Sequence, residues 1–275
     1  MLTRRAFALA LPWLSAAALP SAASEGGVLR FVRIRHRTVL VEIEGRRVLV
    51  DPCFEHAFGA PGLWQAPPPA FDAGAVGDLD LLVVTGSEPG AFSAASTREL
   101  RDRAVPCLVP DERVAKTLRH QGFRRVRVVA GGDALHVGGI DVRVSPSATL
   151  GAAPGVGVHL ARGGRTMWFA GAPPPIDVDG RAVAFARANA AEVVAVCALG
   201  LSFGGMPLTL DADDALLLAR LARARHLVPL HLDATPTGIG ALVLSQARAV
   251  QGPAPGGPRL VVVPAGTWCR VGTFG

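Results

Sequence analysis

The feature that most constrains the fold is a short apolar run at 79–84, which stops abruptly at a polar turn containing glycine. Such a run predicts a buried strand, and a helix is expected to begin soon after it, at Ser93 or Ser96. In α/β proteins a turn that follows a buried strand often carries binding or catalytic groups, because the strand holds the turn in place. The side chains that this turn offers for chemistry are those of Thr85, Ser87 and Glu88, and none of them is a histidine.

The expected elements around this run follow one order twice: strands first, then strands alternating with helices. The first half contains strands at 28–35, 38–44, 47–50, 107–109 and 125–129, and helices at 97–103 and 112–121. The second half contains strands at 134–137, 140–145, 156–161, 166–170, 193–199, 226–230, 260–263 and 267–271, and helices at 181–190, 212–223 and 239–246. This order predicts an α/β fold, an αββα four-layer sandwich of two mixed β-sheets with outer helices.

The N-terminus has the pattern of an export signal. Arg4, Arg5 and Phe7 precede an apolar stretch at 8–19, and small residues follow it up to Ala23. The paired arginines predict a twin-arginine signal, and an ordinary secretory signal that happens to carry two arginines is the alternative. We expect cleavage after Ala23 and a periplasmic or extracellular location. Stable membrane insertion is not expected, because the apolar stretch is too short to span a bilayer.

After a signal peptide at 1–23, the composition favours one domain over 26–275. The chain has 275 residues, half of them hydrophobic, which is enough for one sizeable core, and no stretch is typical of a linker. The formal net charge is +6, but the arginines are spread along the chain without interleaved aromatic residues. A nucleic-acid-binding face would gather them, so no nucleic-acid partner is expected.

The cysteines do not suggest a metal site. No CxxC pair occurs, and the four cysteines are Cys53, Cys107, Cys197 and Cys269. Disulfides are permitted in an exported protein, but the last three lie in expected strands. Buried free thiols are therefore the favoured interpretation.

Five short blocks occur in an order that resembles the metallo-β-lactamase superfamily, and more closely its branch of bacterial ascorbate-phosphate lactonases and related predicted hydrolases. They span nearly all of the mature chain: 48–52, 80–85, 144–146, 167–171 and 226–231. By this resemblance the first block is a strand that ends in Asp-Pro, and the second leads into the metal-binding loop. The last block ends in a Pro-x-His whose histidine is the final metal ligand.

In this superfamily a Thr-His-x-His-x-Asp-His loop holds one or two metal ions, usually zinc, which convert a bound water into a nucleophile. Thr85 matches the threonine of that loop, and His231 is the one family ligand that this chain retains. The residues at the other ligand positions are Gly86, Glu88, Gly90, Ala91, Thr149 and Ala172. Glycine and alanine have no donor atoms, and a catalytic zinc site needs three protein ligands. The resemblance therefore implies that the ordinary dinuclear site is absent.

We interpret the chain as a metallo-β-lactamase-fold pseudoenzyme that needs no cofactor and binds a small ligand or a protein partner. The loop at 52–77, with its proline-rich part at 61–69, is the expected lid or contact surface. A second hypothesis is a metal-dependent hydrolase, of the lactonase or phosphoester type, with a rebuilt mononuclear zinc site. A third is a subunit whose degenerate site is covered by an active paralogue. The residues expected around the pocket are Asp51, His56, Thr85, Glu88 and His231.

Overall fold

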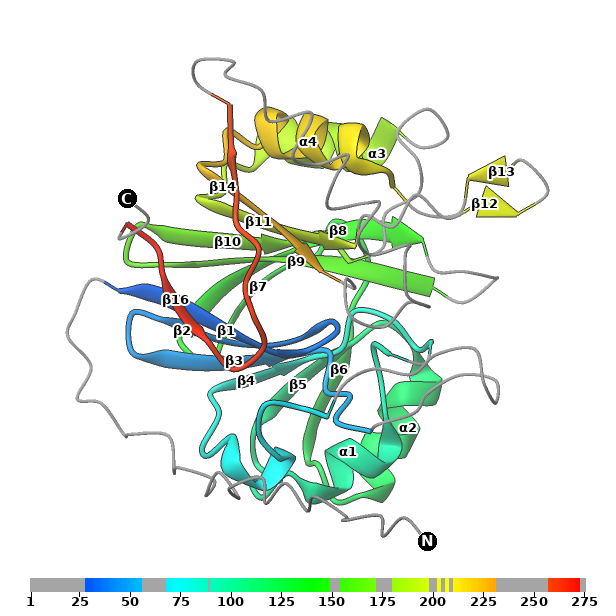
Figure 1. Cartoon of the computed structure of the whole chain (residues 1–275). Helices are drawn as coiled ribbons and strands as arrows, with labels where there is room; N and C mark the ends of the chain where they lie inside the picture. Colours follow the sequence, from blue (N-terminus) through cyan, green and yellow to red (C-terminus); the bar gives the residue numbers. More distant parts are fainter. Residues whose placement is uncertain are drawn as a thin grey trace, which may run out of the picture.

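The computed structural model describes residues 28–55, 68–88, 90–148, 154–171, 180–197, 202–203, 206–207, 210–230 and 257–272. In these parts two β-sheets are stacked in the middle of the molecule (Figure 1). Helices α1 (Ala94–Glu99) and α2 (Glu112–His120) lie outside the first sheet. Helices α3 (Gly180–Ala188) and α4 (Ala212–Leu221) lie outside the second. The αββα sandwich predicted from the sequence is confirmed.

The first sheet is mixed and has the strand order β16-β1-β2-β3-β4-β5-β6. Strands β1 to β3 form an antiparallel meander, whereas β3 to β6 run parallel to one another. The strands are β1 (Leu29–Arg35), β2 (Thr38–Ile43), β3 (Arg46–Val50), β4 (Leu81–Val83), β5 (Pro106–Val109), β6 (Arg125–Val128) and β16 (Trp268–Arg270). The run at 79–84 is thus an inner strand, β4, as its apolar composition predicts.

The second sheet is also mixed, with the order β15-β14-β11-β10-β9-β8-β7. Its antiparallel half is β7 to β10, and its parallel half joins β10 to β11, β14 and β15. The strands are β7 (Ala134–Val137), β8 (Ile140–Ala148), β9 (Pro154–Arg162), β10 (Arg165–Phe169), β11 (Val193–Cys197), β14 (His226–Leu230) and β15 (Arg259–Leu260). A short hairpin, β12 (Ser202–Phe203) and β13 (Met206–Pro207), and a 3₁₀ turn, η1 (Ala73–Ala75), complete the described elements.

One predicted helix is placed differently in the structure. The helix expected over 97–103 begins at Ala94, because the Ser93 side chain accepts a hydrogen bond from a backbone N–H in its first turn. It ends at Glu99, because Leu100 takes an extended backbone conformation. The segment 100–103 is therefore not helical, and the helix expected over 239–246 lies outside the described residues.

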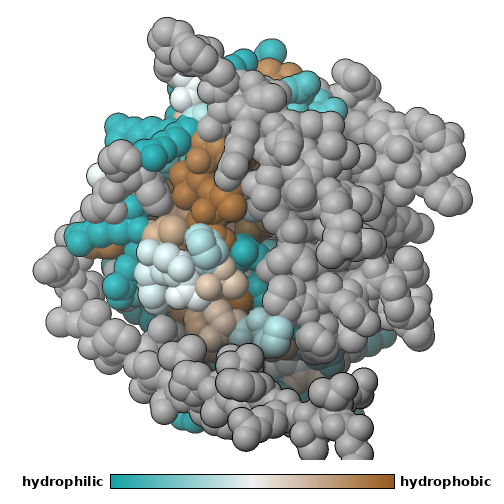
Figure 2. All heavy atoms as spheres, viewed as in Figure 1, coloured by the Kyte–Doolittle hydropathy of each residue, from teal (hydrophilic) through white to brown (hydrophobic). Residues whose placement is uncertain are grey.

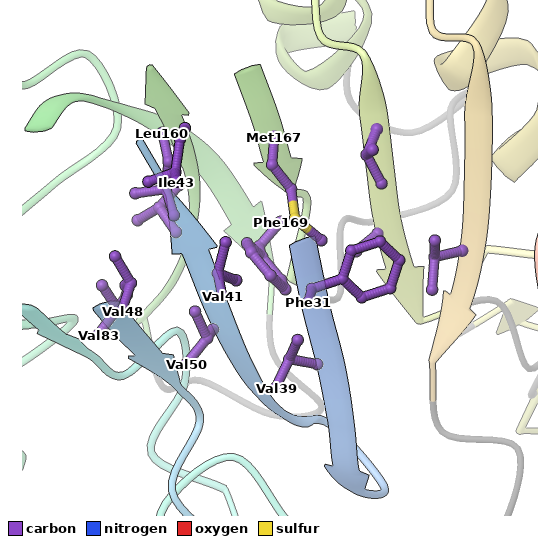
Figure 3. Packing of buried hydrophobic residues seen from close by; sticks show 14 of the residues in the cluster. Phe31, Val39, Val41, Ile43, Val48, Val50, Val83, Leu160, Met167 and Phe169 are labelled. Carbon is purple, nitrogen blue, oxygen red and sulfur yellow. The ribbon is translucent and has the colours of Figure 1, made fainter. Parts of the chain in front are cut away.

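The main hydrophobic cluster fills the space between the two sheets. Along β2, Val39, Val41 and Ile43 belong to this cluster, whereas Leu40 belongs to the cluster on the outer face. This alternation is the period-two pattern of a strand buried on both faces. Figure 3 shows valines of β2 and β3 lying close to Phe169 and Met167 of the second sheet. Two further clusters join the outer faces of the sheets to the helices.

Few large hydrophobic side chains are exposed among the described residues: Val128, Leu217 and Val262. Figure 2 shows hydrophobic residues in a band on the face in view, with hydrophilic residues to the left of the band. In the part of the chain that the structure describes, no helix is long and apolar enough to cross a membrane. The expected export signal at 1–23 lies outside that part and remains a prediction.

All four cysteines are free and buried. Burial raises the pKa of Cys197 to about 11 and that of Cys107 to about 12. Burial also raises the pKa values of Cys53 and Cys269. Since the thiolate is the reactive form, these cysteines have the environment of packing residues rather than of nucleophiles.

We expect the folded protein to react slowly with a thiol reagent, because its thiols are buried and protonated at neutral pH. Four thiols should become reactive when the unreduced protein is unfolded in guanidinium chloride. The measurement is a thiol count before and after unfolding, with a reduced, unfolded sample as the control. A count of two in the unreduced, unfolded protein would show a disulfide and contradict the structure.

Candidate functional site

Four polar side chains meet at one edge of the first sheet. β3 and β4 are parallel, so the residues that follow them, Asp51 and Thr85, lie at the same edge. β2 runs antiparallel to β1 and β3, so the β1–β2 turn, which carries Arg37, also reaches this edge. Glu88 lies in the loop after β4. We call these four residues, Arg37, Asp51, Thr85 and Glu88, the Arg37 cluster.

The backbone at Asp51 ends β3 and brings its carboxylate to Thr85. Asp51 adopts φ 51°, in the left-handed region that aspartate enters more readily than most residues. Its backbone N still donates to Val83 O at 2.9 Å, so the turn leaves the sheet only after one more interstrand hydrogen bond. Its side chain then accepts two hydrogen bonds from Thr85, from the backbone N to Oδ1 and from Oγ1 to Oδ2, both at 2.7 Å.

The Arg37 guanidinium bridges the two carboxylates of the cluster. Its Nη2 lies 3.1 Å from Asp51 Oδ2 and donates to Thr85 Oγ1 at 2.6 Å. Its Nη1 donates to the Glu88 carboxylate. Arg37 keeps only 4% of its surface exposed, and Asp51 and Thr85 keep 2% each. The cluster is therefore a buried ion-pair network rather than a surface salt bridge.

Burial and charge act in opposite directions on the two central groups. Burial raises the pKa of Asp51 to about 6, although Arg37 and the two Thr85 donors lower it. Burial alone would lower the pKa of Arg37, but the facing Cys197, Asp51 and Glu88 raise it above its ordinary value. The guanidinium therefore remains charged at any accessible pH, and both carboxylates of the cluster lie against it.

In the loop after β4, the side chain of Glu88 fills the space beside Gly86. A Cβ added at Gly86 would lie 2.0 Å from Glu88 Oε2, so the Glu88 carboxylate fills the space that a side chain at position 86 would need. Glu88 Oε2, Arg37 Nε and the Ser87 hydroxyl are buried, and none has a hydrogen-bond partner among the described residues. Further along the loop, Gly90 has φ 99°, a conformation that residues with side chains rarely adopt.

A cleft of about 600 Å³ lies beside the cluster, at the same edge of the sandwich. It is lined by residues at the ends of β5, β6, β8 and β9 and by the first turns of α3, including Val129, Pro146, Ala184 and Phe185. Val156, another lining residue, donates its backbone N–H to Thr85 O at 2.8 Å. The cleft and the cluster are thus joined through one backbone hydrogen bond.

The sequence of the chain matches a known family model. The model described as the beta-lactamase superfamily domain matches residues 46–232, which is more than half of the chain. The chain belongs to the metallo-β-lactamase superfamily. The resemblance inferred from the sequence is therefore confirmed at the level of the family. A comparison with curated protein sequences finds no match.

Several solved structures share the superfamily fold with this chain. The isothiocyanate hydrolase from Delia radicum gut bacteria has a TM-score of 0.69 and 16% identity, and the alignment covers 87% of this chain and 98% of that chain. A possible metal-dependent hydrolase from Veillonella parvula has a TM-score of 0.69 and 14% identity, with 88% and 99% covered. The protein YhfI from Bacillus subtilis has a TM-score of 0.61 and 12% identity, with 88% and 99% covered. At these identities the likeness shows the fold alone.

The residues that the structure describes do not fit the metal site of the superfamily. Gly86, Gly90 and Ala91 have no side-chain donors, and both nearby carboxylates already bind the Arg37 guanidinium. In the described ranges, no group of three or more His, Cys, Asp or Glu side chains is arranged to hold a metal ion. The donor set at this edge, as far as it is described, suits a guanidinium.

The structure brings together three of the five pocket residues expected from the sequence: Asp51, Thr85 and Glu88. The other two, His56 and His231, lie outside the described residues, as do Thr149 and Ala172. Ala91 is fully buried in the loop.

Sequence reasoning missed Arg37, the residue at the centre of the cluster. It lies in a short hairpin turn, 14 residues before Asp51 and 51 residues before Glu88, and no motif links these positions. The one available signal was topological. Two successive hairpins in a three-strand meander place the first turn at the same edge as the end of the third strand, so Arg37 and Asp51 had to lie near one another.

We expect Arg37→Met to destabilise the fold by about 3–5 kcal/mol, because it leaves two carboxylates close together at a largely buried site without their cation. Gly86→Ala should cost less, about 1–2 kcal/mol, since it displaces only Glu88 from the guanidinium. The measurement is the free energy of unfolding in urea. Arg98→Met, at an exposed arginine of α1, is the matched control. An Arg37→Met protein as stable as this control would contradict the assigned network.

Proposed function

We propose that this protein is an exported, non-hydrolytic member of the metallo-β-lactamase superfamily that binds a small ligand at the edge where its relatives have their metal site. The observation that supports this proposal is the contact of the Arg37 guanidinium with both Asp51 and Glu88. A protein partner is the other occupant that this edge could receive. The export signal expected at 1–23 would place this function outside the cytoplasm.

The argument against metal-dependent hydrolysis is electrostatic as well as compositional. A zinc ion bound to Asp51 would lie about 2 Å from a carboxylate oxygen, and the guanidinium Nη2 lies 3.1 Å from Asp51 Oδ2. Two unit charges 4 Å apart near a protein surface repel by about 4 kcal/mol, so a divalent ion and a guanidinium would repel by about 8 kcal/mol. A metal at Asp51 would therefore require Arg37 to leave its buried position.

The cleft beside the cluster supports ligand binding. Its volume of about 600 Å³ lies within the range of small-molecule sites, and its lining is largely apolar but includes the polar residues Arg181 and Ser147. An apolar wall with a few polar groups suits a ligand that is mostly apolar and is oriented by one or two polar atoms. Residues 61–67 of the loop that we expect to act as a lid lie outside the described residues.

One observation favours a second candidate function, a hydrolase with a rebuilt mononuclear site. Asp51 and Glu88 already contact a single cationic group, and several structural neighbours are described as hydrolases. If Arg37 moved away, these carboxylates could act with His56 and His231 as ligands. This candidate makes a direct prediction about metal content, which separates it from our proposal.

We expect mature protein purified without chelator from its exported form to contain less than about a tenth of an equivalent of zinc, iron or manganese. This result would be diagnostic, because a catalytic site retains its metal through purification. The measurement is elemental mass spectrometry. His136→Ala, which changes an exposed histidine of β7, is the control for nonspecific binding. About one equivalent in the wild type, lost in both His231→Ala and Glu88→Ala but kept in the control, would establish the hydrolase instead.

The ligand can be sought by extraction of the purified protein. We expect a small molecule to co-purify with the wild type and to be lost in Ala184→Trp, because the indole would fill the cleft. Ala95→Trp, at an exposed alanine of α1, is the matched control and should retain the molecule. The measurement is mass spectrometry of the extract from equal amounts of folded protein. Equal extracts from the two variants would contradict a ligand site in this cleft.

A further inference from the structure

A second hollow lies on another part of the molecule, between the last strands of the two sheets. β6 ends the first sheet and β7 ends the second, and each has only one neighbouring strand among the described residues. A groove of about 360 Å³ is lined by residues of β5, β6 and β7. It lies near the amino ends of β5 and β6, whereas the cleft beside the Arg37 cluster lies at their carboxyl ends. The groove is thus a separate site.

The groove has an excess of positive charge. Arg124, Arg125 and Arg127 line it, all three are exposed, and no aspartate or glutamate is among the lining residues. The fourth polar lining residue, His136, pairs with Asp141 at 2.7 Å.

Other arginines of the described chain have carboxylate partners, among them Arg30, Arg46, Arg119 and Arg165. No such partner, and no side-chain hydrogen bond, occurs for the three groove arginines within the parts of the chain that the structure describes. Their charges therefore remain available to a ligand.

The strand register explains why two of these arginines share one face. Arg127 is the register partner of Leu108, and Leu108 belongs to the cluster between the sheets. Register partners lie on the same face, so Arg125 and Arg127 extend from the face of β6 that is turned towards the second sheet. Val126, between them, packs on the outer cluster instead.

The rest of the groove is apolar. Pro106 and Leu108 of β5 and Leu135 and Val137 of β7 line it together with the arginines. A peptide that adds as a strand alongside β6 is not the favoured ligand, because Arg119 Nη2 already donates to Val126 O of β6 at 3.3 Å. Guanidinium groups beside an apolar wall suit a compact molecule with both characters, since the planar fork of arginine matches carboxylate and phosphate oxygens.

We propose that this groove binds a small organic dianion, one that carries carboxylate or phosphate charge on an apolar body. Arg125 and Arg127 bind the charged groups, Arg124 adds to the positive potential, and the β5 and β7 side chains contact the apolar body. The volume of the groove is within the range of small-ligand sites. The site shares no residue with the Arg37 cluster or its cleft, so it stands or falls independently of the function proposed above.

The test is isothermal titration calorimetry of the folded, mature protein with two probes, benzene-1,2-dicarboxylate and phenyl phosphate. At least one should bind saturably, and the one that binds more tightly identifies the charged group of the natural ligand. Pyrophosphate and benzyl alcohol, which lack the apolar body and the charge respectively, should bind more weakly. The affinity should also fall as salt is added, because the guanidinium groups are exposed to solvent.

Variants assign the binding to the groove. Arg125→Gln combined with Arg127→Gln should weaken the binding of the probe by about tenfold or more, since two charge-assisted hydrogen bonds are lost. Arg98→Gln combined with Lys116→Gln removes the same charge from exposed positions on α1 and α2 and should leave the affinity unchanged. All four changes are at exposed side chains, and thermal melting checks that both proteins fold. Absence of saturable binding, or equal weakening in both double variants, would overturn the proposal.

Discussion

The interaction on which this edge of the molecule depends is the buried pair of Arg37 and Asp51. Desolvation of either charge alone would cost several kcal/mol, so each needs the other and the Thr85 donors around them. Through these contacts the β1–β2 turn, the end of β3 and the loop after β4 are held at one point. Glu88 then extends the network and fills the space above Gly86. The shape of the loop follows from these ion pairs.

The main hydrophobic core does not include any residue of that network. This core lies between the sheets and is built from alternating side chains of both, so it is complete without any group at the edge. A superfamily fold of this kind can therefore change the chemistry of its loops while it keeps its architecture. In this chain the loop positions that lack donor atoms adjoin a fixed cation, the Arg37 guanidinium of a neighbouring turn. The chemistry of the loop therefore suits an ion-pair network rather than a metal ion.

The two hollows differ in chemistry because they differ in position. The cleft at the carboxyl ends of β5 and β6 adjoins a cluster whose charged groups pair with one another, and its own lining is largely apolar. The groove near the amino ends of the same strands is lined by arginines without partners among the described residues. A ligand at the cleft would be chosen mainly by shape, whereas one at the groove would be chosen by charge. The protein can bind both ligands at once, because the cleft and the groove share no lining residue.

The sequence by itself determined the layer architecture and most elements, because apolar runs and capping residues are local signals: the run at 79–84 that contains β4 and the Ser93 cap of α1 are examples. It also showed that Gly86, Gly90 and Ala91 lack donor atoms, since this depends on residue type alone. Only the tertiary structure decided that Arg37 joins Asp51 and Glu88, and that Arg125 and Arg127 share a groove with β7. These contacts join residues distant in the chain, and their partners are set by strand order and register, which no local pattern encodes.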